Sequence, residues 1–249
     1  MTYQIVMPIY KDLPHIAEHL EALNDWEHLL IVDNSVDSFC KKFEGRGAKI
    51  EYRPANIGVS RAWNLGIAED KDYTFFVSSS VKFNKGFKEV ADHLQQLINE
   101  NDLNLVAYLA DDNPNKGEFK SNNIEWGLFT QLGWHCNGVS KLTVEKIGYF
   151  DENFYPAYME DTDYCVRMGL AQIPGRHQDV PAYCQKTGQA IDSGATTNPA
   201  RSTDYWNKKW GGTLDIPEFN KPFGDKPLDY WPERSIAEII EEWDNREGA

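Results

Sequence analysis

Three acidic residues crowd into one short segment whose neighbours are aromatic. Glu160, Asp161 and Asp163 follow an aromatic run in FDENFYPAYMEDTDYCVRMGL, residues 150–170. Carboxylates that lie against aromatic walls and against one another can have raised pKa values, which suits a general base. Acids at a helix start, with an Asp163–Arg167 pair one turn apart, explain the same residues structurally. The segment therefore predicts either a proton-accepting site or a stabilised helix start.

A second polar group begins a predicted helix in NIGVSRAWNLGI, residues 56–67. Backbone N–H groups at a helix start favour an anion, and Arg61 and Asn64 share one face of this helix. We interpret Asn56, Arg61 and Asn64 as facing a ligand and the apolar members as core.

Asp33 closes an apolar run in LLIVDNS, residues 29–35. A carboxylate at the end of a strand can accept hydrogen bonds from a base or a ribose. An Asx turn explains the same residues equally well. The sequence leaves both roles open for Asp33.

Two further motifs have competing explanations. His15, Glu18 and His19 match an HxxEH zinc pattern, which would imply a zinc hydrolase. We favour an amphipathic surface helix, because no third ligand is evident. Lys208 and Lys209 in YWNKKWGG, residues 205–212, are compatible with a phosphate clamp or a solvated helix end before glycine.

The elements that must position these residues alternate between strand and helix patterns. Strands and helices that alternate at this spacing predict an α/β fold with a mostly parallel sheet. Ligands on such sheets lie at the carboxyl ends of the strands. The expected strands are 3–9, 29–32, 49–52, 73–77 and 103–109, and the expected helices are 12–23 (capped by Asp12), 58–68, 85–99, 141–148, 161–170 and one that starts at Ser235. The carboxyl ends to search are Pro8–Tyr10, Asp33–Ser35, Arg53–Asn56 and Ser78–Ser80.

Composition limits the classes of function. The chain has 249 residues and a formal net charge of −14, which argues against broad, sequence-blind binding to nucleic acid or an anionic membrane. No apolar window is long enough to span a membrane. The four cysteines form no CxxC pair, so we expect free thiols and a cytoplasmic location.

Five of these segments, in this order, resemble GT-A-fold glycosyltransferases of the family-2 type. They are the strand ending in Pro8-Ile9-Tyr10, IVDNS, NIGVSRAWN, FFVSSSV and GYFDENFYPAYMEDTDYCVR. The KWGG run and PEFNKPF that follow are similar to tails of such enzymes in bacteria and phages. The resemblance implies a GT-A domain over residues 1–212, with a nucleotide-binding half at about 1–110 and an acceptor half at about 111–212. Residues 213–249 would form an extended arm and a C-terminal helix packed on the same domain.

The resemblance implies inverting transfer of a sugar from a nucleotide diphosphate sugar, with a UDP-sugar as the default, to a hydroxyl of a glycan or lipid-linked glycan. Asp161 would be the general base, and Glu160 would help to shape the pocket. The other implied site residues are Pro8 and Tyr10 beside the base, Asp33 on base or ribose, Asn56, Arg61, Asn64 and Ser80 on the rest of the donor, and Trp134, His135 and Tyr158 around the sugar or acceptor.

One departure concerns the metal. Ser80 stands where the family usually has the aspartate that holds Mn²⁺ or Mg²⁺, and a hydroxyl is a poor substitute for a carboxylate on a hard cation. Three interpretations are open, in this order. The reaction is metal-independent, with Arg61, Lys82, Arg201 or Lys208 neutralising the diphosphate. A metal is held elsewhere, with Asp111 and Asp112 as candidates. Or catalysis is lost and binding kept.

Two alternatives to a glycan glycosyltransferase follow. One is a phage-type enzyme that glycosylates a hydroxymethylated DNA base, which the net charge disfavours although Lys208, Lys209 and Lys221 offer a basic track. The other is a catalytically inactive sugar-nucleotide or carbohydrate-binding protein. The proline-rich tail is open to two uses, as a lid over the acceptor site or as a dimer contact, and the oligomeric state is undetermined.

Overall fold

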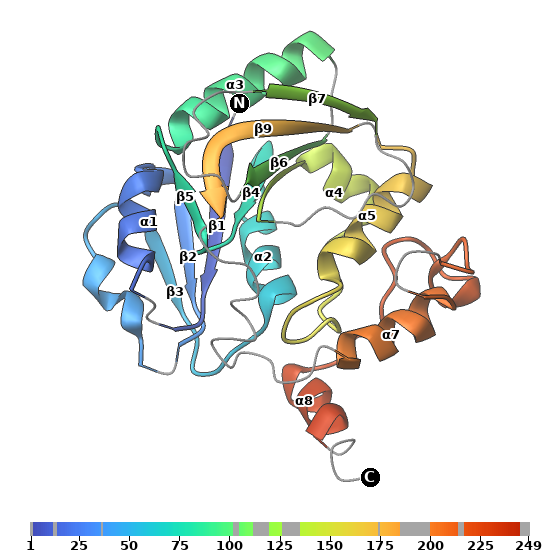
Figure 1. Cartoon of the computed structure of the whole chain (residues 1–249). Helices are drawn as coiled ribbons and strands as arrows, with labels where there is room; N and C mark the ends of the chain where they lie inside the picture. The colour runs from blue at the N-terminus through green and yellow to red at the C-terminus, as the bar shows by residue number, and fades with distance from the viewer. Residues whose placement is uncertain are drawn as a thin grey trace.

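The protein is described by a computed structural model, which covers residues 2–11, 14–35, 37–101, 105–111, 120–125, 135–173, 175–184, 200–213 and 217–244. Helices flank one twisted sheet (Figure 1). The strands are β1 (Tyr3–Ile9), β2 (Leu29–Asp33), β3 (Lys49–Tyr52), β4 (Tyr73–Val77), β5 (Val81–Phe83), β6 (Leu105–Asp111), β7 (Lys120–Glu125), β8 (Cys136–Ser140) and β9 (Gly175–Cys184). The α-helices are α1 (Ile16–Leu23), α2 (Val59–Ile67), α3 (Phe87–Asn101), α4 (Lys141–Ile147), α5 (Glu160–Leu170), α7 (Ala200–Trp210) and α8 (Ile236–Asp244), and short 3-10 turns cover Trp26–His28, Phe39–Phe43 and Pro222–Gly224.

The strand order is β3-β2-β1-β4-β8-β6-β9-β5, with β7 beside β9. β3, β2, β1 and β4 are parallel, which confirms the expected α/β architecture. β8 lies antiparallel between β4 and β6, whereas β6 and β9 are parallel. The second half of the chain thus extends the same sheet with strands of both directions.

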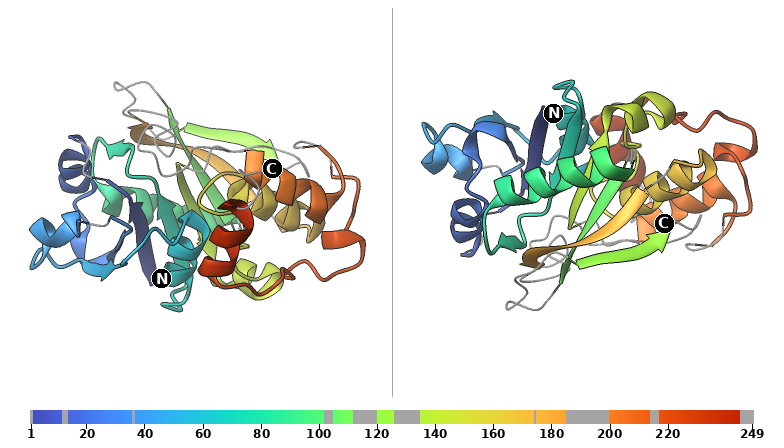
Figure 2. Two further views of the ribbon diagram at one scale, coloured as in Figure 1. Left: turned by 90° about the horizontal axis from the view of Figure 1, so that it is seen from below. Right: turned by 90° about the horizontal axis from the view of Figure 1, so that it is seen from above.

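Alternate residues of the central strands pack against different helices, because successive side chains point to opposite faces of a sheet. On one face, Ile5 and Met7 of β1 pack with apolar residues of α1 and α3. On the other, Val6 packs with residues of α2, α4 and α5. Figure 2 shows α3 on one side of the sheet and α4 with α5 on the other. The helix that carries the acidic segment is therefore anchored on the core of the parallel half of the sheet.

The start of α1 differs from the sequence prediction. The N-cap position is His15, whose side chain makes no capping hydrogen bond. The helix begins later than the predicted 12–23, and Asp12, the expected cap, lies outside the described residues. The apolar stripe is as expected, since Ile16, Leu20 and Leu23 are all buried.

The segment after α7 lies against the loop that precedes α5. Trp206 and Trp210 of α7 are fully buried in a third apolar cluster with Phe154 and Val166.

Ser235 caps α8 by accepting a hydrogen bond from the Glu238 N–H, and the Glu238 carboxylate accepts one from the Ser235 N–H. This reciprocal pair is a capping box. In the described part of the chain, no helix is both long and apolar enough to cross a membrane.

Candidate active site

The carboxyl ends of the parallel strands meet at one edge of the sheet. Ile9 of β1, Asp33 of β2 and Tyr52 of β3 are aligned across the sheet by register. The backbone continues this alignment beyond the strands, because the Asn34 N–H bonds the Ile9 carbonyl and the Arg53 N–H bonds the Asp33 carbonyl. Polar residues from three separate segments are thus brought to the edge where α/β folds bind ligands.

The loop before α5 joins this edge through the start of α2. The Val59 N–H donates to the Pro156 carbonyl at 2.8 Å, and the Tyr155 hydroxyl donates to the Asn56 carbonyl at 3.1 Å. Gly58 permits the contact. Its φ is +82°, and a Cβ there would lie 3.0 Å from the Tyr155 ring and 3.1 Å from the Pro156 carbonyl oxygen. The structure therefore brings the NIGVSR segment and the acidic segment together.

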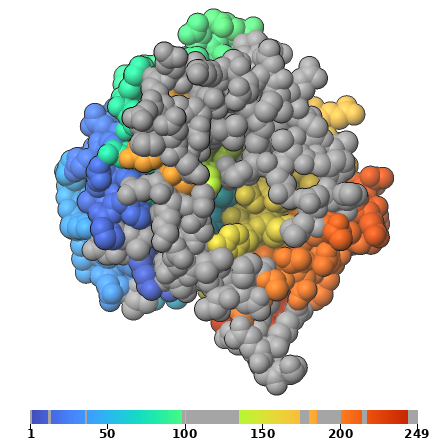
Figure 3. Space-filling model, viewed as in Figure 1, coloured from blue at the N-terminus to red at the C-terminus, as the bar shows by residue number. Residues whose placement is uncertain are grey.

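Glu160 and Asp161 form the first turn of α5, where they have different surroundings. Glu160 is buried, and its Oε2 has no hydrogen-bond partner among the described residues. Burial, and then the neighbouring Asp161 charge, raise the pKa of Glu160 well above its usual range. Asp161 is half-buried and accepts a hydrogen bond from the Thr162 N–H at 2.7 Å. In Figure 3 the yellow part of the chain, which includes α5, reaches the surface beside the orange α7.

Two carboxylates in such different settings suit different roles. The buried acid stays protonated more readily, whereas its half-exposed neighbour is placed to accept a proton. The two carboxylates thus have different surroundings, and the separate roles that the resemblance implies for them stay predictions.

Asp33 forms an Asx turn, which is one of the two roles that its sequence pattern predicts. Its carboxylate is fully buried and accepts hydrogen bonds from the Ser35 N–H at 2.9 Å and the Cys40 N–H at 2.8 Å. The Ser35 hydroxyl bonds the same carboxylate. Contact with a base or ribose stays a prediction, and it would require this carboxylate to become accessible.

Of the three polar residues predicted to face a ligand, Asn56 and Asn64 bond the protein's own backbone, whereas Arg61 is partly exposed. Asn56 Oδ1 accepts from the Gly58 N–H at 2.9 Å. Arg61 lies 3.7 Å from the Glu152 carboxylate, and its side chain is 42% exposed. Asn64 is buried and bonds both the N–H and the carbonyl of Phe150, each at 2.9 Å. Arg61 is the most accessible of the three for a diphosphate, while Asn64 holds the loop that leads to α5.

The serine turn after β4 does not offer a divalent-cation site. Ser80 is buried, lies within hydrogen-bonding distance of Ser78 Oγ at 2.7 Å and accepts from Cys184 Sγ at 3.3 Å. None of these groups is a carboxylate, which Mn²⁺ and Mg²⁺ prefer. Asp25, Glu27 and His28 are the group of potential metal ligands within the described residues, and they precede β2, at the opposite end of that strand from the serine turn's edge. The described residues therefore do not fit a metal at Ser80.

The HxxEH residues are engaged with neighbouring strands. His19 is fully buried, and its Nδ1 bonds the Ser79 carbonyl at 2.7 Å. Glu18 forms an ion pair and hydrogen bond with Lys82 of β5, which lower the pKa of Glu18. The surface-helix interpretation is wrong for His19, because that side chain is buried against the serine turn. The contact with Glu18 engages Lys82, one of the predicted phosphate-neutralising residues.

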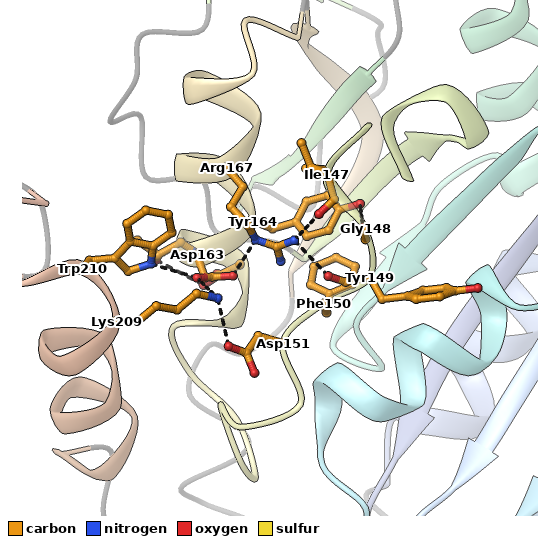
Figure 4. A network of polar contacts seen from close by, with 12 residues as sticks. Ile147, Gly148, Tyr149, Phe150, Asp151, Asp163, Tyr164, Arg167, Lys209 and Trp210 are labelled. Atoms are coloured by element: carbon orange, nitrogen blue, oxygen red, sulfur yellow. Dashed lines mark hydrogen bonds and ion pairs between the residues drawn. The ribbon is translucent and has the colours of Figure 1, made fainter. Parts of the chain in front are cut away.

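A buried charge network links α7 to α5 (Figure 4). Lys209 Nζ lies 2.9 Å from Asp151 and 2.7 Å from Asp163, and all three side chains are fully buried. Asp163 also accepts hydrogen bonds from Trp210 Nε1 at 2.9 Å and Arg167 Nε at 2.8 Å. Burial acts to raise the pKa of Asp163, but the Lys209 and Arg167 charges outweigh it and lower that pKa.

This network corrects the prediction that Lys209 lies on a phosphate clamp or a solvated helix end. Its carboxylate partners lie 58 and 46 positions earlier in the chain, so no local pattern reveals them. Lys208 is 56% exposed and lies 3.7 Å from Glu242 of α8. The sequence signal that could have located the network is the clustering of Asp151, Asp163 and Arg167 in the segment already singled out.

The remaining predicted site residues have these positions. Pro8, Tyr10, Tyr158 and Arg201 are half-buried, and the His135 carbonyl accepts from the Ser78 N–H. Arg201 belongs to the first turn of α7, where the Ser202 hydroxyl bonds the Ala157 carbonyl at 3.0 Å and fixes α7 beside the loop before α5. Trp134 and Asp112 lie outside the described residues, and of Asp111 only the backbone, at the end of β6, is described.

Comparisons with known proteins agree on the fold. No protein-family model matches the sequence. A galactofuranosyl glycosyltransferase of Leishmania donovani is 57% identical over 30 residues, which are 12% of this chain and 7% of that protein. Among solved structures, S. aureus TarS superposes with a TM-score of 0.56 at 15% identity, over 86% of this chain and 44% of TarS.

Two further structures were solved with sugar nucleotides or their parts. The mannosyltransferase PcManGT from Pyrobaculum calidifontis, in complex with GDP-Man and Mn²⁺, gives a TM-score of 0.52 at 11% identity over 72% of this chain and 56% of that one. GalNAc-T7 with UDP, GalNAc and Mn²⁺ gives 0.50 at 11% identity over 74% and 43%. The chain spans little more than half the length of these proteins at most. With its parallel half-sheet and the acidic turn at its carboxyl edge, the chain has the GT-A glycosyltransferase fold.

Proposed function

We propose that the protein is an inverting glycosyltransferase that moves a sugar from a nucleotide diphosphate sugar to a hydroxyl acceptor. The observation that carries the proposal is the Glu160–Asp161 pair at the start of α5. It lies on a GT-A fold, beside the carboxyl edge of the sheet. The short match to a galactofuranosyl glycosyltransferase and the fold of the mannosyltransferase support the same reaction class.

Asp161 acts as the general base in this proposal. It takes the proton of the acceptor hydroxyl while that oxygen attacks the anomeric carbon of the donor. The bond from the anomeric carbon to the diphosphate oxygen breaks, the nucleoside diphosphate leaves, and the configuration inverts. Glu160, kept protonated by burial, adds no second negative charge beside the developing base.

The negative charge of the leaving diphosphate needs a cation or a set of donors. Arg61 and Arg201 are the best placed of the four proposed residues, because Arg61 is partly exposed and α7 is fixed beside the loop before α5. Lys82 is paired with Glu18, and Lys208 lies near Glu242. The serine turn does not fit a metal, so we propose transfer without Mn²⁺ or Mg²⁺.

UDP is the default nucleotide and a glycan or lipid-linked glycan the proposed acceptor. The structural neighbours include complexes with GDP-Man and with UDP, so both bases belong in the test. A DNA-base acceptor is less well supported, because Lys209 is buried and leaves the proposed basic track interrupted. The four cysteines are buried and form no disulfide, which supports a cytoplasmic location.

A thermal-shift panel of UDP-, GDP-, CDP- and dTDP-sugars, each with and without Mn²⁺, tests the proposal. A ligand present at 100 times its Kd stabilises the folded state by about 2.7 kcal/mol, which corresponds to roughly 5–10 °C for a chain of this size. We expect a shift with one nucleotide class that does not depend on Mn²⁺, followed by sugar transfer. Binding without transfer to any acceptor would favour the inactive binding protein, and no shift at all would contradict the proposal.

A further inference from the structure

A small cavity lies between the loop that precedes α5 and the segment that leads into α8. Its volume is about 170 Å³, and its walls are Glu152, Asn153, Trp231, Pro232, Glu233, Arg234 and Ile239. The loop side and the C-terminal side are about 80 positions apart in sequence, so the cavity exists only because this chain's C-terminal segment packs here.

Hydrogen bonds between the two sides hold the cavity open in one shape. Asn153 Nδ2 donates to the Pro232 carbonyl at 3.1 Å, and Arg234 Nε donates to Asn153 Oδ1 at 2.7 Å. Asn153 is in turn bonded to Asp151 of the buried charge network. A site whose walls are fixed before binding loses less entropy when a ligand arrives.

The charges of the walls exclude an anion. Glu152 and Glu233 are acidic, and the Arg234 guanidinium forms an ion pair with Glu242 of α8. A phosphate or a nucleotide diphosphate would meet a net negative surface, so the donor is not the occupant of this cavity. Arg61 lies 3.7 Å from Glu152 on the side of α2 and does not line the cavity.

The remaining chemistry fits a neutral sugar. Trp231 supplies an indole, half-buried, for the apolar face of a pyranose or furanose ring, while carboxylates accept hydrogen bonds from sugar hydroxyls. Sites that enclose a whole drug-sized ligand measure about 300–1,000 Å³. This smaller cavity therefore suits a single sugar unit, with the rest of the oligosaccharide in solvent.

The cavity is also within reach of the reaction centre. Glu152 and Glu160 are eight positions apart on one loop, which limits their separation to about 27 Å even if that loop were fully extended. We propose that the Trp231 cavity is an acceptor subsite, which binds one neutral sugar unit of an oligosaccharide at a distance from the hydroxyl that is glycosylated. This inference rests on the proposed function, and it specifies the acceptor as a saccharide of at least two units.

Binding of the full-length protein to an immobilised panel of neutral, amino-sugar and anionic oligosaccharides tests the proposal. We expect wild-type protein to bind a set of neutral glycans and Trp231→Ala to bind them about tenfold or more weakly. Tyr230→Ala is the matched control, because Tyr230 is an adjacent aromatic residue, 39% exposed, that does not line the cavity. The control should retain the wild-type affinity, and both variants should keep the wild-type unfolding temperature.

Several results would overturn the subsite. These are equal glycan affinity for Trp231→Ala and wild type, no glycan binding by wild type, or binding confined to cationic amino sugars and removed by salt. Nucleotide-induced thermal shifts of the same three proteins separate this failure from failure of the proposed function. If Trp231→Ala loses glycan binding but keeps the nucleotide-induced thermal shift, the defect lies in the subsite alone. An absent nucleotide shift in wild type contradicts the glycosyltransferase proposal whatever the glycans do.

Discussion

Replacing Lys209 by methionine removes the single ammonium group between two fully buried carboxylates. In the native protein the charges balance, because Lys209 and Arg167 face Asp151 and Asp163. After the change, Asp163 keeps Arg167 and the Trp210 N–H. Asp151 keeps hydrogen bonds from the Tyr205 hydroxyl and the Asn153 amide but loses its positive partner. One uncompensated negative charge therefore remains in the protein interior.

Breaking a buried ion pair by removing one partner costs about 3–5 kcal/mol. For a chain of this size, 1 kcal/mol corresponds to about 2–4 °C, so Lys209→Met should lower the unfolding temperature by roughly 6–20 °C. The neighbouring Lys208→Met is the matched control. Lys208 is 56% exposed and its partner is 3.7 Å away, so its loss should cost less than about 1 kcal/mol.

Urea denaturation of the wild type, both lysine variants and the double variant Lys209→Met/Asp151→Asn measures these differences. Removing the stranded charge should recover much of the lost stability, since an amide can replace the carboxylate without a buried charge. A cost below 1 kcal/mol, or no recovery in the double variant, would refute the reasoning.

Three further predictions concern the acidic turn, the loop and the metal. The pKa of Glu160 is raised in the folded state, so wild-type stability should fall relative to Glu160→Gln as the pH rises from about 4.3 through that raised value. Above that value the difference in stability should stay level. A pH-independent difference in unfolding temperature would contradict this prediction. Asn64→Ala leaves the N–H and carbonyl of Phe150 without their partner, so it should lower the free energy of unfolding in urea by about 2 kcal/mol or more. Arg61→Ala should lower it by less than about 1 kcal/mol. Equal losses of stability would rule out the bridging role of Asn64. EDTA should leave transfer largely intact, and complete loss would show that a metal is held elsewhere.

The parallel half of the sheet could be predicted from sequence largely because β1, β2 and β4 are mostly buried apolar runs. β1, β2, β3 and β4 lie within one residue of the expected limits, and α2 and α5 begin within one residue of theirs. Consistent local patterns of this kind identify elements reliably because each strand and helix obeys its own period.

The second half could not be predicted in the same way. β8 reads CNGVS and is buried throughout, but its sequence has neither alternation nor an apolar run. Gly138 belongs in this strand because the Phe75 ring packs against it, and a Cβ there would lie 2.8 Å from that ring. Such a strand is specified by its neighbours, and the residues that pair with Gly138, Phe75 of β4 and Val106 of β6, lie 63 and 32 positions earlier.

The candidate site shows the same division. Local spacing identified the acidic turn and the Asn56–Gly58 segment, which the structure brings together. Spacing did not reveal that Lys209 is internal or that Asn64 holds Phe150, since both roles depend on contacts distant in sequence. Asp33 remains a case in which one pattern serves two roles equally well until its partners are seen.

The most direct test of the account is the Asp161→Asn variant, assayed for both sugar transfer and nucleotide binding. A general base contributes about 10²–10⁴ to the rate, and it acts on the acceptor alone. The account predicts that transfer falls by at least about 100-fold while the nucleotide-induced thermal shift is unchanged. Transfer at the wild-type rate would show that Asp161 is not the base and would contradict the central claim.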